Sequence, residues 1–253
     1  MNITVIGAGH LAYITAAGME SYHKVNVDLK LVKNSDLIWF CYDTPVNSQG
    51  EPDNTFIKNS IIEVLSKTEV NCKHILISSQ IVVGTCESLQ QIFPNFYFSY
   101  SPENLRRGKA LDCFLRPDRI VIGAHTDSRD ILKKLFEPII KSSNSEILFM
   151  SVRSAEMVKH ALNAFLALSI SFINEIDTIC KAVNADSNDV ANGLQSDVRI
   201  GKLSYLKPGA PYTNDTLGRE IHNLINLKKE YILNNVHIIP AIKESNNARN
   251  NNR

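Results

Sequence analysis

Lys159 and Asn163, two polar side chains in an otherwise largely apolar stretch, are the clearest candidates for chemistry. They are four residues apart, so on a helix they share a face. An ammonium group among apolar residues is costly unless it meets a partner or a substrate. Beside a carboxylate such as Glu103, a desolvated lysine could polarise a hydroxyl or stabilise an alkoxide. From spacing alone, a lysine reaching solvent at the helix edge, with Asn163 capping a nearby loop, is the favoured interpretation.

A glycine-containing turn between the first predicted strand and the first predicted helix is a second candidate. Residues 2–6 are mostly β-branched and run directly into Gly7, Gly9 and Ala12. Gly7 permits a tight turn, Gly9 lets the backbone approach a pyrophosphate, and Ala12 allows close helix–strand packing. The helix N-terminus then offers unpaired N–H groups and a partial positive charge to phosphates. The pattern predicts a dinucleotide site.

The same fingerprint requires an acidic residue about 20 positions further on, to hold the ribose hydroxyls. Asp28 lies at that distance, after a short predicted strand. It suits equally well the N-cap of the turn at residues 29–34. The sequence leaves both interpretations open.

Polar, turn-forming segments follow three of the predicted strands. They are residues 43–45, residues 79–80 leading to 84–85, and residues 101–105. Loop composition alone would make each of them a simple turn. In a doubly wound sheet, however, ligands bind beyond the carboxyl ends of the strands, so their recurrence at one edge favours a site.

Short apolar strands alternate with helices up to residue 150, which predicts a parallel sheet covered on both faces. The fold class is α/β, with a Rossmann-type doubly wound parallel sheet at residues 1–150 and a mainly helical domain with one long central helix at 151–243. The Asn-rich residues 244–253 are expected to be disordered. Strands are expected at 2–6, 24–28, 36–41, 74–78, 96–100, 119–122 and 147–150. A first helix is expected to follow the segment at 7–12 and to end at about residue 22, and further helices are expected at 54–68, 86–92, 128–141, 154–183, 189–194 and 217–233.

Composition narrows the class of protein. The formal net charge of +1 over 253 residues gives no reason to expect nucleic acid or an anionic membrane as partner. The five cysteines form no C-x-x-C pair and no His cluster accompanies them, so we expect no metal site and a reduced, cytoplasmic compartment. No signal peptide is expected, and the most apolar run, 161–173, is too short to cross a bilayer. The long helix at 154–183 has too few neighbours to cover it, which predicts a homodimer through this helix.

Several longer strings occur in a specific order. They are Gly7–Gly9, Ser101–Ala110, Arg116–Gly123, Ala155–Ala167, Ile173–Glu175, Asp197–Gly201 and Pro208–Gly209. Together they closely resemble the UDP-glucose/GDP-mannose dehydrogenase family, from residue 1 to about residue 224.

This resemblance implies an enzyme of polysaccharide biosynthesis that oxidises the C6 alcohol of a nucleotide sugar to a carboxylate with two NAD molecules in sequence. The second oxidation in the family passes through a thiohemiacetal on a cysteine, and the resulting thioester is hydrolysed. The resemblance implies that NAD contacts Gly7, Gly9, Thr44, Pro45, Ser79 and Gln80. It implies that the carboxylate of Glu103 lies beside the nicotinamide and the reacting carbon, and that Lys159 and Asn163 donate to the C6 oxygen. It also implies that Arg199 lies near the substrate.

The chain departs from the family in its cysteine motif, where alignment places Thr216, Arg219 and Glu220 at the positions of the nucleophile, a Lys and an Asp. A Thr hydroxyl is barely ionised at neutral pH, whereas a thiol readily forms a thiolate. The family's long segment after the second strand is missing between residues 28 and 29. Its third, nucleotide-binding domain is expected to be absent, and Gln80 stands where Thr is usual.

These features lead to an NAD-dependent oxidoreductase that transfers a hydride from the C6 alcohol of a UDP- or GDP-sugar, without an efficient thioester-dependent second oxidation. The alternative is a catalytically lapsed paralogue that binds NAD or dimerises without turnover. An enzyme of the 6-phosphogluconate or 3-hydroxyacid dehydrogenase type is a third interpretation, against which the string at residues 101–105 argues.

Overall fold

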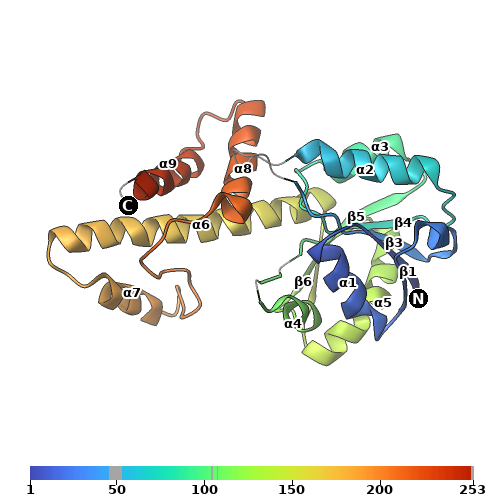
Figure 1. Ribbon diagram of the computed structural model, residues 1–253, viewed down its shortest axis with the longest axis horizontal. Coiled ribbons are helices and arrows are strands. Elements are labelled where there is room, and N and C mark those ends of the chain that lie inside the picture. Colours follow the sequence, from blue (N-terminus) through green and yellow to red (C-terminus); the bar gives the residue numbers. More distant parts are fainter. Residues whose placement is uncertain (46–52, 104, 107, 252–253) are drawn as a thin grey trace. The chain divides into compact units, whose positions relative to one another are not determined.

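The computed structural model describes residues 1–45, 53–103, 105–106 and 108–251 (Figure 1). Asn104 and Arg107, within the string at 101–110, therefore lie outside the described residues. Contacts divide the chain into two units, and the boundary falls between Lys159 and His160, inside a helix, rather than at the predicted position after residue 150.

The first unit contains a seven-stranded sheet in the order β2-β1-β3-β4-β5-β6-β7. All neighbouring strands are parallel except β5 and β6, which meet in antiparallel fashion at Tyr100 and Gly123. The predicted Rossmann-type sheet is confirmed, with the correction that its last two strands run opposite to the first five. The strands are β1 (Asn2–Ile6), β2 (Lys24–Asn26), β3 (Leu37–Phe40), β4 (His74–Ile77), β5 (Tyr97–Tyr100), β6 (Ile120–Gly123) and β7 (Ile147–Met150).

Helices cover both faces of this sheet, because successive strand residues point to opposite sides (Figure 1). Trp39 packs into a core with α1 and α5, whereas the next residue, Phe40, packs into a second core with α2 and α3. One short helix, α4, was not predicted from the sequence. The helical elements of this unit are α1 (His10–Glu20), η1 (Leu29–Asn34, a 3₁₀ helix), α2 (Asn54–Lys67), α3 (Thr85–Ile92), α4 (Ala110–Leu115) and α5 (Thr126–Ser143).

The second unit is helical, as predicted. Its central element is α6 (Val152–Ala182), which begins in the first unit. Side chains of α6 pack with Tyr212, Ile221 and Ile242 in one cluster and with Ala191 and Leu206 in another. The remaining elements are α7 (Ser187–Ser196), η2 (Asn214–Gly218, a single π-helical turn), α8 (Arg219–Glu230) and α9 (Ile238–Asn251).

The expected disordered tail at residues 244–253 is wrong as far as Asn251, because α9 continues to that residue. Two polar side chains of the tail hold it in place. Asn246 is buried and exchanges two hydrogen bonds with the backbone of Tyr212, at 2.9 and 3.1 Å. Arg249 donates to the buried carboxylate of Asp177 at 2.7 Å. Polar composition suggested solvation, but these groups pair with buried partners instead.

Helix α6 leaves several apolar side chains uncovered within the chain. Phe165, Phe172, Ile179 and Val183 are between 45% and 66% exposed, at spacings of seven, seven and four residues. By length and composition alone, α6 is long and apolar enough to cross a membrane, but the core helices of soluble proteins meet the same criteria. It buries Lys159, His160, Asn163, Asn174 and Asp177, which is typical of a helix packed inside a protein. The homodimer stays a prediction.

Candidate active site

The glycine turn after β1 is shaped by the chain that leaves β3. A Cβ atom on Gly7 would lie 2.3 Å from the carbonyl oxygen of Cys41, so only glycine fits. Gly9 has a φ of 109° and serves as the N-cap of α1 without a side-chain cap. Ala12 is buried in the core beneath, as predicted for close helix–strand packing. Gly9 has no side chain with which to cap the first amides of α1, and a helix terminus of this kind suits an anionic group such as a dinucleotide pyrophosphate.

The loops after β3, β4 and β5 meet at one edge of the sheet, as the sequence predicted. The hydroxyl of Ser79 accepts a hydrogen bond from the amide of Tyr42 at 2.7 Å, and the hydroxyl of Thr44 donates to the carbonyl of Gln80 at 2.7 Å. The hydroxyl of Ser78 donates to the carbonyl of Ser101 at 2.7 Å. These bonds hold the three polar loops in register, so the candidate NAD-contacting loops form one continuous rim.

Two predicted cofactor residues lie on the surface beyond this rim. Pro45 is exposed and is the last described residue before position 53. Asp28 is exposed, and its carboxylate accepts a hydrogen bond from the amide of Lys30 at 2.9 Å, capping η1. The structure thus shows the capping role of Asp28, while ribose binding by this residue stays a prediction.

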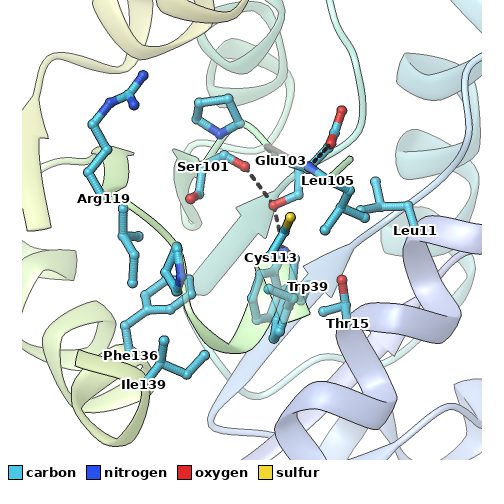
Figure 2. Close-up of a pocket in the computed structure, with 15 residues that line it drawn as sticks. Leu11, Thr15, Trp39, Ser101, Glu103, Leu105, Cys113, Arg119, Phe136 and Ile139 are labelled. Atoms are coloured by element: carbon cyan, nitrogen blue, oxygen red, sulfur yellow. Dashed lines mark hydrogen bonds between the residues drawn. The ribbon is translucent and has the colours of Figure 1, made fainter. Parts of the chain in front are cut away.

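Lys159 and Glu103 form a buried ion pair at the same edge. The Lys159 ammonium donates to Glu103 Oε1 and to the Glu103 carbonyl oxygen, each at 2.7 Å. The two side chains are only 8% and 17% exposed. The other carboxylate oxygen of Glu103 accepts from the amide of Leu105 at 2.9 Å (Figure 2). The interpretation of Lys159 as a solvent-reaching lysine is therefore wrong, because a carboxylate compensates its buried charge.

A cavity of about 60 Å³ adjoins Glu103, and Trp39, Cys113 and Phe136 are among the residues that line it (Figure 2). This is far below the roughly 300–1,000 Å³ of typical ligand pockets. A larger hollow of about 580 Å³ lies beside α3 and the start of α6, but none of the predicted site residues lines it. We therefore place the candidate site at the rim of loops and not in either cavity.

Glu156, a buried carboxylate on α6, was not among the residues predicted from the sequence. It accepts hydrogen bonds from the amides of Gly84 and Cys86 at 2.6 and 2.9 Å, at the start of α3. Its role is to hold the loop that follows Ser79 and Gln80. Because the helix N-terminus attracts a negative charge, this contact satisfies both partners.

Three cysteine thiols are unsuited to act as nucleophiles. Burial raises the pKa of Cys41 to about 12 and that of Cys72 to about 11. The pKa of Cys86 is raised well above its usual range, first by burial and then by the nearby Glu156 carboxylate. Since the thiolate is the reactive form, none of the three replaces a catalytic thiol.

The second unit carries the remaining predicted residues. Glu220 is fully buried and pairs with His160 Nδ1, and the Arg219 Nε lies 3.5 Å from the other oxygen of Glu220. His160 was not singled out in the sequence, although it directly follows Lys159. Thr216 is exposed and lies in the π-helical turn η2, four residues before Glu220. The end of the segment that contains Thr216 is thus anchored by the contacts of the buried Glu220.

Asn163 and Arg199 have contrasting surroundings in this unit. Asn163 is only 5% exposed, and its Nδ2 finds no acceptor among the residues that the structure describes. A buried donor without a partner costs about 1–3 kcal/mol, which a ligand oxygen would offset. Arg199 is 84% exposed and pairs through two nitrogens with the neighbouring Asp197, at 3.0 and 2.6 Å. The hydrogen bonds of Arg199 within the described residues all go to Asp197, and none goes to a predicted site residue.

Comparison with known proteins agrees with these observations. Residues 21–140 match the NAD binding domain of the UDP-glucose/GDP-mannose dehydrogenase family, and residues 153–248 match its central domain. A UDP-glucose 6-dehydrogenase from Rickettsia bellii is 30% identical over 223 residues, which are 86% of this chain and 50% of that protein. UDP-glucose 6-dehydrogenase TuaD from Bacillus subtilis is 32% identical over 206 residues, 78% of this chain and 43% of that protein.

A solved UDP-glucose dehydrogenase from Pyrobaculum islandicum has the same fold, with a TM-score of 0.83 at 23% identity. The similarity covers 98% of this chain and 68% of that one. The chain spans about half the length of the curated relatives that it matches.

Proposed function

The chain belongs to the UDP-glucose/GDP-mannose dehydrogenase family and takes NAD as its cofactor, and on that premise we propose that it oxidises the C6 alcohol of a UDP- or GDP-sugar. NAD supplies the acceptor for the hydride that leaves the alcohol carbon. The hydroxyl loses its proton, so the products are an aldehyde, NADH and one proton. We propose that the reaction stops at this two-electron stage.

The observation that carries the proposal is the buried pair of Lys159 and Glu103. The Lys159 ammonium lies 2.7 Å from the Glu103 carboxylate, so each charge of the buried pair is compensated by the other. It has three N–H donors, of which Glu103 takes two within the described part of the chain. The remaining donor is available to stabilise the negative charge that develops on the sugar oxygen. Preorganised donors of this kind contribute about 10²–10³ to a rate.

Asn163 supports the same proposal from the next turn of the helix. It is four residues after Lys159, so the two side chains share a face of α6. Its Nδ2 is a buried donor with no acceptor in the described residues, as expected of a group that binds a ligand oxygen. We propose that Lys159 and Asn163 both donate to the C6 oxygen.

Thr216 supports the limit at the aldehyde. A hydroxyl with no thiolate character forms the covalent adduct far more slowly than a thiol does. The raised thiol pKa values of Cys41, Cys72 and Cys86 exclude these three as replacements at neutral pH. The second oxidation therefore lacks an effective nucleophile among these residues.

The test is an NADH-release assay with UDP-glucose and GDP-mannose, in which NADH and acid product are both counted. We expect at most one NADH per sugar and no acid for the natural chain, and acid formation for Thr216→Cys. Thr213→Cys, which places a thiol at another exposed position of the same segment, is the matched control. Efficient release of two NADH per sugar by the natural chain would refute the proposal.

A catalytically lapsed, NAD-binding paralogue is the second candidate, and the replacement at Thr216 is the observation that favours it. This candidate predicts calorimetric NAD binding without NADH release for any sugar nucleotide, in the natural chain and in Thr216→Cys alike. Lys159→Met separates the two candidates further, because it lowers turnover by about 10²-fold or more only if turnover exists.

A further inference from the structure

The N-terminus of α1, where the family's dinucleotide is expected to place its pyrophosphate, already meets an anion of the chain itself. The carboxylate of Asp43 accepts a hydrogen bond from the amide of His10 at 3.0 Å. His10 is the first residue of α1, directly after the N-cap Gly9. Within the described part of the chain, this amide is a donor that the Asp43 carboxylate meets.

The pairing of β1 with β3 in the sheet brings Asp43 to this position. Strands β1 and β3 are paired in parallel, and the amide of Cys41 continues this pairing one residue past Phe40 by donating to the carbonyl of Ile6 at 2.7 Å. Gly7 lets the carbonyl of Cys41 approach closely, since a Cβ at this position would lie 2.3 Å from that oxygen. The next turn then carries residue 43 over the start of α1.

Gly9 shows how closely the carboxylate covers the turn. A Cβ on Gly9 would lie 2.2 Å from Asp43 Oδ2. The space that glycine leaves open for a phosphate in this type of turn is thus the space that the carboxylate occupies. A carboxylate and a phosphate compete for such a place, because both are attracted by the same amides and by the positive end of the helix dipole.

We propose that Asp43 is an internal competitor for the dinucleotide, whose carboxylate must leave the amide of His10 before a pyrophosphate can bind. The inference rests on NAD as the cofactor and concerns how strongly the chain holds it. Two effects act in the same direction. The carboxylate loses its contact with the helix terminus, which is worth about two- to fivefold in an equilibrium constant, and it then remains close to two phosphate charges.

The experiment is calorimetric titration of NAD into the full chain and into three variants, at about 50 mM and about 500 mM salt. Asp43→Asn removes the charge and keeps the shape, and Asp43→Gly removes the side chain. Asp36→Asn is the matched control, because Asp36 is also exposed and also accepts a backbone hydrogen bond, at 2.8 Å from the amide of Asn2, at the other end of β3.

We expect both Asp43 variants to bind NAD roughly fivefold more tightly than the natural chain at low salt, and Asp36→Asn to bind like the natural chain. The difference should shrink at high salt, where the Debye length falls to about 4–5 Å. Hydrogen exchange without NAD gives a second readout, in which the first turn of α1 exchanges faster in Asp43→Asn. Thermal unfolding of each variant verifies that it is folded.

Affinities within twofold of the natural chain would overturn the proposal. Weaker binding by both Asp43 variants would also overturn it and would assign the carboxylate to the ribose hydroxyls instead. If NAD binds to the Asp43 variants and not to the natural chain, the proposal is supported, and the Asp43 carboxylate prevents NAD binding in the natural chain. If no variant binds NAD, Asp43 is not the obstacle, and NAD binding by this chain fails independently of the proposal.

Discussion

Replacing Lys159 by Met tests the central feature of the candidate site without any need for a substrate. The change removes the cation from Glu103, whose side chain is 17% exposed, and leaves an uncompensated carboxylate there. Breaking a buried pair by removing one partner costs about 3–5 kcal/mol. Because solvent reaches part of Glu103, we expect a loss of about 2–4 kcal/mol in the free energy of unfolding.

The assay is urea unfolding followed by the fluorescence of Trp39. This is the one tryptophan of the sequence, and it is buried in the core of the same unit as the ion pair. A double-mutant cycle with Glu103→Gln isolates the interaction, since the double variant has neither charge. We expect a coupling energy of about 1–3 kcal/mol, so the double variant is more stable than the sum of the single effects indicates.

Lys67→Met is the matched control. The Lys67 ammonium lies 2.7 Å from Glu63, the same distance as in the buried pair, but the two side chains are 73% and 64% exposed. An exposed helical pair of this kind contributes about 0.3–0.5 kcal/mol. If Lys159→Met and Lys67→Met lower the free energy of unfolding equally, burial does not make the Lys159–Glu103 pair contribute more than an exposed pair. That result would refute the prediction.

Three further predictions concern other parts of the chain. Because burial raises the pKa of Cys41 to about 12 and that of Cys86 well above its usual range, neither should react with a thiol reagent at pH 8 until the chain is unfolded; rapid labelling of the folded chain would contradict this. The pKa of Asp177 is lowered below its usual range by hydrogen bonds from Lys181, Ser187 and Arg249, so its contribution to stability is present above the unfolded pKa near 3.8 and is lost as the pH falls towards the folded pKa. Asp177→Asn should therefore lower the unfolding free energy at pH 7 and flatten its decline below pH 4, and an unchanged acid profile would count against this. Phe165→Glu with Phe172→Glu should convert a dimer to a monomer in light scattering, because both rings are exposed on one stripe of α6, and a natural chain that is already monomeric would disprove the dimer.

The pattern of residue types determined the architecture of the first unit. Runs of buried β-branched and aromatic residues alternate with helices, and burying them requires a largely parallel sheet that helices cover on both faces. The carboxyl ends of parallel strands share an edge, so the convergence of the loops at Thr44, Ser79 and Glu103 was predictable as well. The reversed direction of β6 was not predictable, because side chains alternate between the two faces of a sheet in the same way in parallel and antiparallel strands.

Side-chain pairing between distant segments was decided only by the tertiary structure. Local spacing made Lys159 a surface lysine, and composition made Asn246 and Arg249 part of a disordered tail. Each has a partner more than 30 residues away, in Glu103, Tyr212 and Asp177 respectively. A polar side chain is stable in the interior only when such a partner meets it, and sequence spacing carries no information about a partner so far along the chain.

The same division holds for the cofactor site. The sequence alone determined that Gly7 and Gly9 form a phosphate-type turn, because only glycine allows such a close approach of backbone. That Asp43 reaches the start of α1 depends on the pairing of β1 with β3, which brings residues 33 positions apart within 3.0 Å. Strand pairing, and not local sequence, therefore decided which anion lies at that helix terminus.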